Sequence, residues 1–266
     1  ILLKPGMYMG AVTPSTEEKY IFTSDSLIES KFISMVPGLY KIFDEAVVNA
    51  RDHVIRCLEA KQGQLMKIDN AYPHKVHFVS EIRVNVCPTT GRITVYNDGN
   101  GIPVEKNTEL DMWIPQMVFT VGRSGSSFSD DKTNEMIGGQ NGYGMKIAFI
   151  WSTEVEIETL DCNTKQRYVQ QFHNNLGIID PPVITKAPAK STPYTRVSFI
   201  PDFARFGFSG MTPDLMSLFR RRVYDICAVT NSENKRNVQV YFNDELIPIT
   251  NFTDYTKMYF PPDQVP

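Results

Sequence analysis

An apolar stripe with helical spacing runs through residues 39–50. Its members recur every three or four positions: Leu39, Ile42, Phe43, Ala46, Val47 and Ala50. The spacing predicts an amphipathic helix that starts at Pro37-Gly38 and packs on one side. On a second face of this helix, Glu45, Asn49 and either Asp52 or His53 stack at intervals of one turn. A polar line beside a buried face is a candidate functional site.

Alternation with a period of two replaces the helical spacing between residues 75 and 97. Its apolar members are Val76, Phe78, Ile82, Val84, Val86, Ile93 and Val95. With residues 88–91 as the turn, this pattern predicts an antiparallel hairpin. Further strands are expected at residues 154–160, 167–172 and 195–200, and a last hairpin at residues 238–249, turned at Asn243-Asp244.

Three more helices are expected, at residues 113–121, 143–151 and 212–229. Between the first two, residues 122–141 are polar and show no period, which is typical of a mobile lid. Strands and helices are segregated along the chain, and no internal repeat or low-complexity tract interrupts them. The pattern predicts one α+β domain over residues 1–266, with a mixed sheet covered on one face by helices.

Composition narrows the class of protein. Of the 266 residues, 42% are hydrophobic and 21% are charged, as in ordinary globular proteins. No apolar run approaches the length of a membrane span, and the start does not read as a signal peptide. The net charge of −3 argues against a surface built mainly to neutralise nucleic-acid phosphates. Four cysteines without a Cys-x-x-Cys pair predict reduced thiols rather than zinc ligands or disulfides.

Three glycine-bearing segments carry the candidate chemistry: residues 97–103, 124–127 and 138–146. The third places several unshielded backbone N–H groups at the start of a helix, with a lysine in its first turn, which is how proteins hold a polyphosphate. It is neither a Walker P-loop nor a Rossmann fingerprint, since the required spacing and the preceding strand are missing. Each of these segments in isolation is consistent with an ordinary turn, but the occurrence of all three in this order is not explained by turns alone.

The strings Pro-Gly-Leu-Tyr-Lys-Ile-Phe-Asp-Glu (residues 37–45), Asn-Asp-Gly-x-Gly-Ile-Pro (97–103) and Gly-Gly-x-Asn-Gly-Tyr-Gly-x-Lys (138–146) carry a resemblance. They resemble the N-terminal ATPase domain of eukaryotic-type DNA topoisomerase II, a type IIA enzyme. Weaker matches at residues 3–10, 194–202 and 221–225 extend the resemblance through the chain. It implies the GHKL or Bergerat fold, a two-layer α+β sandwich whose mixed, mostly antiparallel sheet has helices on one face and a glycine-rich ATP lid.

The resemblance also implies roles for individual residues. Glu45 is expected to be the general base that activates the water attacking the γ-phosphate, and Asn49 to bind Mg²⁺. Asp98 is expected to accept a hydrogen bond from the adenine amino group, at a position where guanine offers no donor, and Thr195 to assist at the base. The remaining nucleotide contacts are expected from the lid and the helix after it: Ser126, Ser127, Phe128, Gly139, Gln140, Asn141, Gly142, Tyr143, Gly144 and Lys146.

The sequence departs from the family at three of the positions that concern the nucleotide. His53 stands where the helix usually has a third asparagine, Gln140 where arginine is frequent, and Phe128 where asparagine often follows two serines. A histidine still offers a hydrogen bond to a phosphate, whereas Gln140 removes a positive charge near it. We therefore expect these changes to alter the affinity for the nucleotide rather than the hydrolysis reaction.

For the whole protein, the resemblance implies an entry gate that forms a homodimer on binding ATP and acts on duplex DNA through other domains. The chain is expected to lack the transducer and DNA-cleavage domains, so that it binds Mg-ATP but turns it over slowly. The expected location is the nucleus, with organellar and viral cytoplasmic versions as alternatives. Two other readings are a chaperone or mismatch-repair ATPase of the same superfamily, and a non-catalytic binding domain whose glycine loops are only turns.

Overall fold

The structure is a computed structural model that describes residues 5–24, 26–61, 76–121, 143–233, 237–261 and 263–264. The helices in these ranges are α1 (Gly6–Met9), α2 (Pro37–Lys61), α3 (Ile114–Thr120), α4 (Gly144–Ile150), α5 (Pro213–Glu233) and α6 (Phe252–Lys257), with a 3-10 turn η1 (Phe203–Phe206). The lid expected at residues 122–141 lies outside the described residues.

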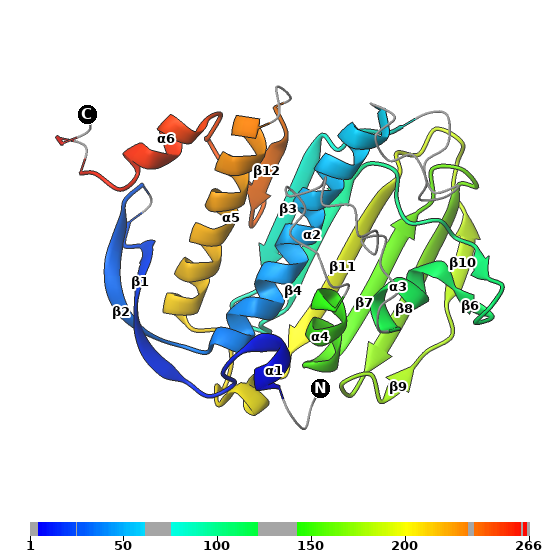
Figure 1. Cartoon of the computed structure of the whole chain (residues 1–266), viewed down its shortest axis with the longest axis horizontal. Coiled ribbons are helices and arrows are strands. Elements are labelled where there is room, and N and C mark those ends of the chain that lie inside the picture. Colours follow the sequence, from blue (N-terminus) through cyan, green and yellow to red (C-terminus); the bar gives the residue numbers. More distant parts are fainter. Residues whose placement is uncertain are drawn as a thin grey trace.

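The strands are β1 (Ser15–Phe22), β2 (Ile28–Met35), β3 (Glu81–Val86), β4 (Ile93–Asp98), β5 (Lys106–Asn107), β6 (Met112–Trp113), β7 (Ser152–Leu160), β8 (Gln166–His173), β9 (Ile178–Ile179), β10 (Val183–Lys186), β11 (Tyr194–Pro201), β12 (Gln239–Phe242) and β13 (Glu245–Leu246). In the described part of the chain, nine of these strands form one sheet, ordered β10-β8-β7-β11-β4-β3-β12-β13, with β9 paired to β8 (Figure 1). The β1–β2 and β5–β6 pairs form two separate two-stranded sheets. In the nine-stranded sheet, the β12–β3 pair is parallel and the other pairs are antiparallel.

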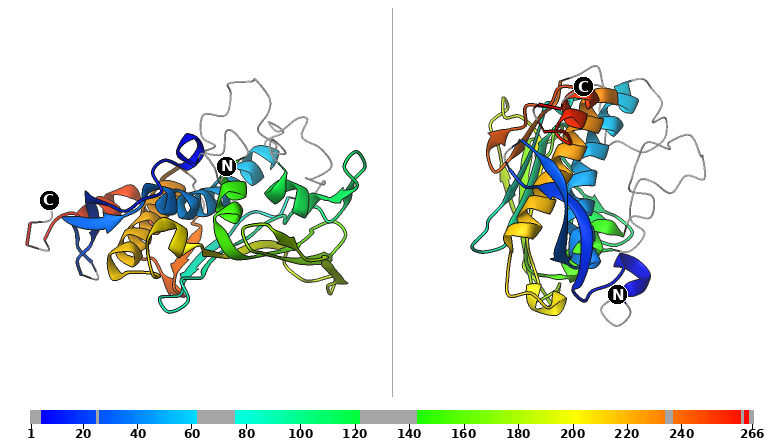
Figure 2. Two further views of the ribbon diagram at one scale, coloured as in Figure 1. Left: turned by 90° about the horizontal axis from the view of Figure 1, so that it is seen from below. Right: turned by 90° about the vertical axis from the view of Figure 1, so that its left-hand side faces the viewer.

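One face of this sheet carries the helices and the other is bare (Figure 2). On β7, Val155 and Ile157 face the helices and are buried, whereas the alternate Glu154 and Glu156 lie on the bare face. The rings of Phe43 on α2 and Phe219 on α5 stack with their centroids 4.0 Å apart, which joins the two long helices within the helical layer. The predicted two-layer α+β sandwich with a mixed sheet is therefore confirmed.

The helix predicted from the apolar stripe is confirmed as α2, which runs for 25 residues from Pro37. Leu39, Ile42 and Phe43 of the stripe are each 0% exposed, so the stripe faces the core as its spacing predicts. Proline suits the first helical position because its missing N–H would have no partner there. The helix thus carries its polar line beside the buried stripe, as the spacing predicts.

The first predicted hairpin is confirmed as β3–β4, but its first strand begins at Glu81 rather than near Lys75. Two backbone N–H groups just before Glu81 donate hydrogen bonds to side chains and not to the backbone of a neighbouring strand. The His77 N–H donates to Asn100 Oδ1 at 2.7 Å, and the Ser80 N–H to Asp98 Oδ1 at 2.7 Å. Residues 76–80 are therefore anchored to the Asp-Gly loop instead of extending the strand.

The hairpin predicted at residues 238–249 is confirmed in a shorter form, as β12 and β13. Asn243 and Asp244 have positive φ of 47° and 64°, which matches the two-residue turn predicted for them. The sequence pattern does not reveal that β12 also pairs in parallel with β3, which makes the sheet mixed.

The β1–β2 ribbon has no counterpart among the predicted elements. It is a separate two-stranded antiparallel sheet that packs on α5, where the Phe22 and Tyr224 rings meet edge to face at 4.7 Å. Most of its side chains are exposed and polar, so the apolar alternation that marks a strand is weak. In the described part of the chain, no helix is both long and apolar enough to cross a bilayer.

Candidate active site

The polar line on α2 lies between two glycines that belong to the other glycine-bearing segments. Glu45, Asn49 and His53 follow one another at intervals of one turn. At one end, a Cβ on Gly144 would lie 1.7 Å from Glu45 Oε2, and at the other, a Cβ on Gly99 would lie 2.8 Å from His53 Nε2. The structure therefore brings the α2 face, the Asp-Gly turn and the start of α4 together, as the three motifs require.

Glu45 is held at the α4 end of this line. Its Oε1 forms an ion pair with Lys41 Nζ one turn earlier, and its Oε2 lies against the backbone of Gly144. The side chain is 17% exposed, so the carboxylate is largely covered yet open on one side. A carboxylate fixed in this way is suited to orient a water molecule.

Asn49 occupies the middle of the line. Its Nδ2 donates to the backbone oxygen of Glu45 at 2.7 Å, which fixes the side-chain amide. The amide oxygen is the remaining acceptor, and an oxygen ligand suits a hard cation such as Mg²⁺. In the described ranges no group of three His, Cys, Asp or Glu side chains is arranged to hold a metal. That is compatible with Mg²⁺ held by one or two protein oxygens together with phosphates and water.

His53 is a neutral side chain packed under the Asp-Gly turn. Burial, and to a lesser extent the charge of Arg56, lowers the pKa of its imidazole to about 3. Its Nε2 lies 3.6 Å from Cys57 Sγ and would lie 2.8 Å from a Cβ on Gly99, whose φ of +116° favours glycine. Histidine in place of asparagine thus puts an uncharged imidazole ring next to the Asp-Gly turn.

Asp98 is buried at the end of β4 and accepts three hydrogen bonds. The backbone N–H groups of Ser80 and Glu81 donate to Oδ1 at 2.7 and 3.0 Å, and the Ser80 hydroxyl donates to Oδ2. A carboxylate has about four acceptor positions, so one is left. Its role as the acceptor from adenine stays a prediction, and its observed partners give it the further task of anchoring residues 80–81.

Thr195 lies on the helix-covered face of the sheet, beside a residue that the sequence analysis did not select. Thr195 on β11 pairs directly with Asn97 on β4 and with Thr159 on β7. Its Oγ1 lies 3.3 Å from Thr159 Oγ1, and Asn97 is buried. Asp98 pairs instead with Tyr194, whose side chain lies on the bare face. Asn97, not Asp98, therefore shares the face of Thr195.

The end of the third glycine segment is the start of α4. Tyr143 precedes this helix, and its ring lies 6.3 Å from that of Tyr8 on α1. Lys146 is 4% exposed, and burial lowers the pKa of its ammonium group to about 8. A bound anion would raise the pKa of this buried lysine, because the negative charge favours the charged ammonium form.

The other expected nucleotide contacts fall outside the described residues, and their positions stay predictions. They are Ser126, Ser127, Phe128, Gly139, Gln140, Asn141 and Gly142.

The sequence analysis missed three residues that the structure places at the site: Lys41, Ser80 and Asn97. The i, i+4 spacing to Glu45 was a usable signal for Lys41. For Asn97 the signal was the alternation of β4, because Ile93, Val95 and Asn97 share a face. The contact of Ser80 with Asp98 spans 18 residues and has no local signature.

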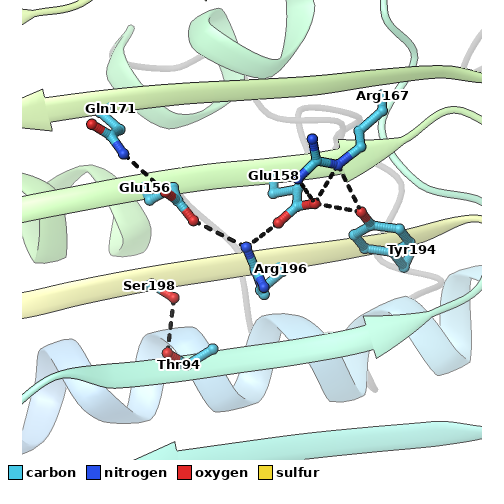
Figure 3. Close-up of polar contacts among 8 residues, drawn as sticks. All are labelled: Thr94, Glu156, Glu158, Arg167, Gln171, Tyr194, Arg196 and Ser198. Atoms are coloured by element: carbon cyan, nitrogen blue, oxygen red, sulfur yellow. Dashed lines mark hydrogen bonds and ion pairs between the residues drawn. The ribbon is translucent and has the colours of Figure 1, made fainter. Parts of the chain in front are cut away.

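The bare face of the sheet carries a second polar cluster (Figure 3). Glu158 is 3% exposed and is contacted by Arg167, Arg196 and the hydroxyl of Tyr194. Glu156 pairs with Arg196 at 3.1 Å. Acidic and basic groups neutralise one another within this cluster, so it offers no surplus charge for a ligand, and the candidate site remains the α2 face.

Comparisons with known proteins show what the chain is similar to. The family of histidine kinase-, DNA gyrase B- and HSP90-like ATPases matches residues 35–205. The chain is 38% identical to a DNA topoisomerase 2 of Acanthamoeba polyphaga mimivirus over 267 residues, which is 98% of this chain and 19% of that protein. It is also 38% identical to the DNA topoisomerase 2 of Saccharomyces cerevisiae over 261 residues, which is 97% of this chain and 16% of that protein.

A solved structure shows the same arrangement of elements. The crystal structure of the ATPase region of Saccharomyces cerevisiae topoisomerase II matches with a TM-score of 0.84 and 36% identity, covering 97% of this chain and 62% of that one. The chain thus spans less than a fifth of the length of the curated relatives, given shares of 19% and 16%.

Proposed function

The chain belongs to the family of histidine kinase-, DNA gyrase B- and HSP90-like ATPases, and we propose that it is the ATP-binding and ATP-hydrolysing gate domain of a type II DNA topoisomerase. The observation that carries the proposal is the contact between the Glu45 carboxylate on α2 and the backbone of Gly144 at the start of α4. This contact joins a candidate base to the segment expected to hold the phosphates. The similarity to DNA topoisomerase 2 over nearly the whole chain supports the narrower assignment.

In this proposal Glu45 is the general base. Phosphoryl transfer depends mainly on positioning and charge stabilisation, so the carboxylate has to be held where water attacks in line with the leaving group. Lys41 and Gly144 hold it from two sides. Asn49 lies one turn further along α2, and its free amide oxygen is the ligand for Mg²⁺, which supplies charge stabilisation at the phosphates when it is bound.

The adenine base is proposed to lie at the end of β4. Asn97 and Thr195 face the helical layer there. The acceptor for the adenine amino group is proposed to be Asp98, as the sequence motif predicts, or Asn97, which shares the face of Thr195. Recognition of that amino group selects adenine over guanine, which has a carbonyl oxygen at the same place. Thr159 supports this end of the sheet, because its Oγ1 accepts from the N–H of Ile102 at 2.8 Å and fixes the loop after Asp98.

The triphosphate is proposed to lie toward α4. Tyr143, Gly144 and Lys146 start this helix, and Lys146 supplies a positive charge. Seven further residues complete the proposed phosphate and ribose contacts: Ser126, Ser127, Phe128, Gly139, Gln140, Asn141 and Gly142.

The activity of the whole protein is part of the same proposal. Residues 1–266 would form one ATPase domain that dimerises with a second copy on binding ATP, and other domains would bind duplex DNA and pass one duplex through a break in another. The relatives' larger size supports further domains, since the chain spans 16% to 19% of two of them. We propose a nuclear location, with organellar and viral cytoplasmic locations as the alternatives. The relative from a mimivirus supports a viral version of the protein.

The experiment that tests the proposal compares ATP hydrolysis by the parent chain, Glu45→Gln and the exposed control Glu105→Gln. Protein is kept in excess over ATP, so that slow turnover is still measured. Glu45→Gln should bind a non-hydrolysable ATP analogue as the parent does and hydrolyse ATP at least about 100-fold more slowly. Glu105→Gln should match the parent. Undiminished hydrolysis by Glu45→Gln would show that Glu45 is not the base.

A further inference from the structure

Lys41 reaches the candidate base from the previous turn of α2. Its Nζ forms an ion pair with Glu45 Oε1, and the two side chains are 45% and 17% exposed. The pair therefore lies at the rim of the site, with the lysine reaching in from the surface. The proposed function assigns this lysine no contact with the nucleotide.

Helix stability does not account for Lys41. It is the fifth residue of α2, close to the positive end of the helix dipole, where a cation is unfavourable. The order Lys then Glu at i, i+4 is also the less stabilising of the two orders. A single pair in this order therefore contributes little to the stability of the helix.

The position of Lys41 is better explained by its effect on the Glu45 carboxylate. A glutamate side chain has several rotatable bonds, so an unrestrained carboxylate samples many positions. Glu45 instead has one oxygen on Lys41 and the other against Gly144. Gly144 limits how far the carboxylate can move toward α4, and Lys41 holds it from the other side.

We propose that Lys41 is a positioning residue for Glu45, which holds the carboxylate in the orientation needed to direct the attacking water. It acts through Glu45 and does not touch the nucleotide. The inference rests on the proposed role of Glu45 as the general base.

Two rival roles for Lys41 predict different measurements. A lysine that binds a phosphate directly would weaken nucleotide binding when it is removed and would leave the rate of the bound state nearly unchanged. A lysine that only stabilises the helix would lower the melting temperature and leave both the affinity and the rate of the folded protein unchanged. A positioning residue changes the rate alone.

The experiment compares Lys41→Met, Lys41→Arg and the control Lys19→Met, which removes a similar ion pair with Glu17 on β1. Single-turnover ATP hydrolysis, affinity for a non-hydrolysable analogue and melting temperature are measured for each. Lys41→Met should slow hydrolysis roughly 10- to 100-fold, because a small misplacement of a catalytic group has costs of this size. Its affinity should stay within about twofold of the parent, a change below 0.5 kcal/mol. Lys41→Arg should restore most of the rate, and Lys19→Met should match the parent.

A second comparison places Lys41→Met in a Glu45→Gln background. If Lys41 acts through Glu45, the double variant hydrolyses ATP no more slowly than Glu45→Gln alone. An additional full-sized loss in the double variant would overturn the proposal, as would an unchanged rate in Lys41→Met or a loss of affinity without a loss of rate. Full turnover by Glu45→Gln alone would instead contradict the proposed function, so the two failures are distinguishable.

Discussion

The carboxylate of Glu45 rests against the backbone of Gly144, so closely that a side chain at that glycine would have to displace the carboxylate. A Cβ built there would lie 1.7 Å from Glu45 Oε2. Because Gly144 begins α4 and Glu45 belongs to α2, this contact sets the distance between the proposed base and the start of α4. Glycine is needed here because of the neighbouring Glu45 side chain and not because of the backbone conformation of Gly144.

Gly144→Ala is therefore expected to displace the Glu45 carboxylate. The added methyl group should lower the stability of the chain by about 1–3 kcal/mol and slow ATP hydrolysis about as much as removing the carboxylate. Thermal unfolding and single-turnover hydrolysis measure the two effects. Gly210→Ala is the control, since nothing lies within 4 Å of a Cβ at that position. Parent-like hydrolysis by Gly144→Ala would mean that the observed contact does not position the base.

The two residues at the end of β4 are expected to respond differently to substitution. Asn97→Ala should weaken binding of an ATP analogue at least about tenfold, because Asn97 faces the helical layer beside Thr195. It should lower the melting temperature less than Asp98→Ala does, because among the described residues it removes a single hydrogen bond, from Asn97 Nδ2 to the backbone oxygen of Asp98. Asp98→Ala should lower the melting temperature as well, since the buried N–H groups of Ser80 and Glu81 lose their acceptor. Lost binding with an unchanged melting temperature in Asp98→Ala would identify Asp98 as the direct acceptor from adenine.

Much of this arrangement was predictable from local patterns. The stripe that begins at Leu39 gave α2, and the i, i+4 spacing of Glu45 and Asn49 placed them on one face. The alternation along β4 also predicts that Asn97 shares a face with Val95. The resemblance, however, implied the adenine contact for Asp98.

What the sequence could not give depends on contacts between distant residues. The anchoring of Ser80 by Asp98 needs the hairpin to be folded first, and the contact of Glu45 with Gly144 spans two helices. The β1–β2 ribbon carries too few apolar positions to show a period. Its packing against α5 decides its structure.

Nucleotide affinity is expected to fall as the pH rises through about 8. Burial lowers the pKa of Lys146 from 10.5 to about 8, so the nucleotide-free protein loses this positive charge near that pH. Binding of a triphosphate favours the charged lysine, and above pH 8 it therefore has to be accompanied by proton uptake. Titration calorimetry between pH 7 and 9.5 in two buffers of different ionisation enthalpy measures the uptake. Lys146→Arg should flatten this dependence, because arginine stays charged throughout.

The same pKa shift affects the stability of the nucleotide-free chain, with the opposite dependence. The folded-state pKa of about 8 lies below the unfolded value of 10.5, so the unfolded chain binds more protons between these pH values. Stability contributed by this group therefore rises from about pH 8 to 10.5. Urea unfolding of the parent and of Lys146→Met across this range isolates the effect, and identical pH slopes in the two proteins would contradict it.

The ion pair between Asp44 and Arg222 is expected to couple α2 to α5. Arg222 Nε lies 2.6 Å from Asp44 Oδ1, and the side chains are 24% and 20% exposed. A double-mutant cycle with Asp44→Asn and Arg222→Met should give a coupling energy of about 1–2 kcal/mol in urea unfolding. The exposed pair of Lys106 and Asp111 is the control and should give less than about 0.5 kcal/mol. Equal coupling energies in the two pairs would show that the Arg222 contact adds nothing beyond a surface pair.

The most direct test of the central claim is calorimetric binding of a non-hydrolysable ATP analogue with Mg²⁺ to the chain, with the matching GTP analogue as the comparison. The account predicts one ATP analogue bound per chain and at least about tenfold weaker binding of the GTP analogue, because recognition at the end of β4 depends on the adenine amino group. Asn49→Ala should weaken the binding seen with Mg²⁺. Absence of binding, or equal binding of the two analogues, would contradict the assignment of this face of α2 as an ATP site.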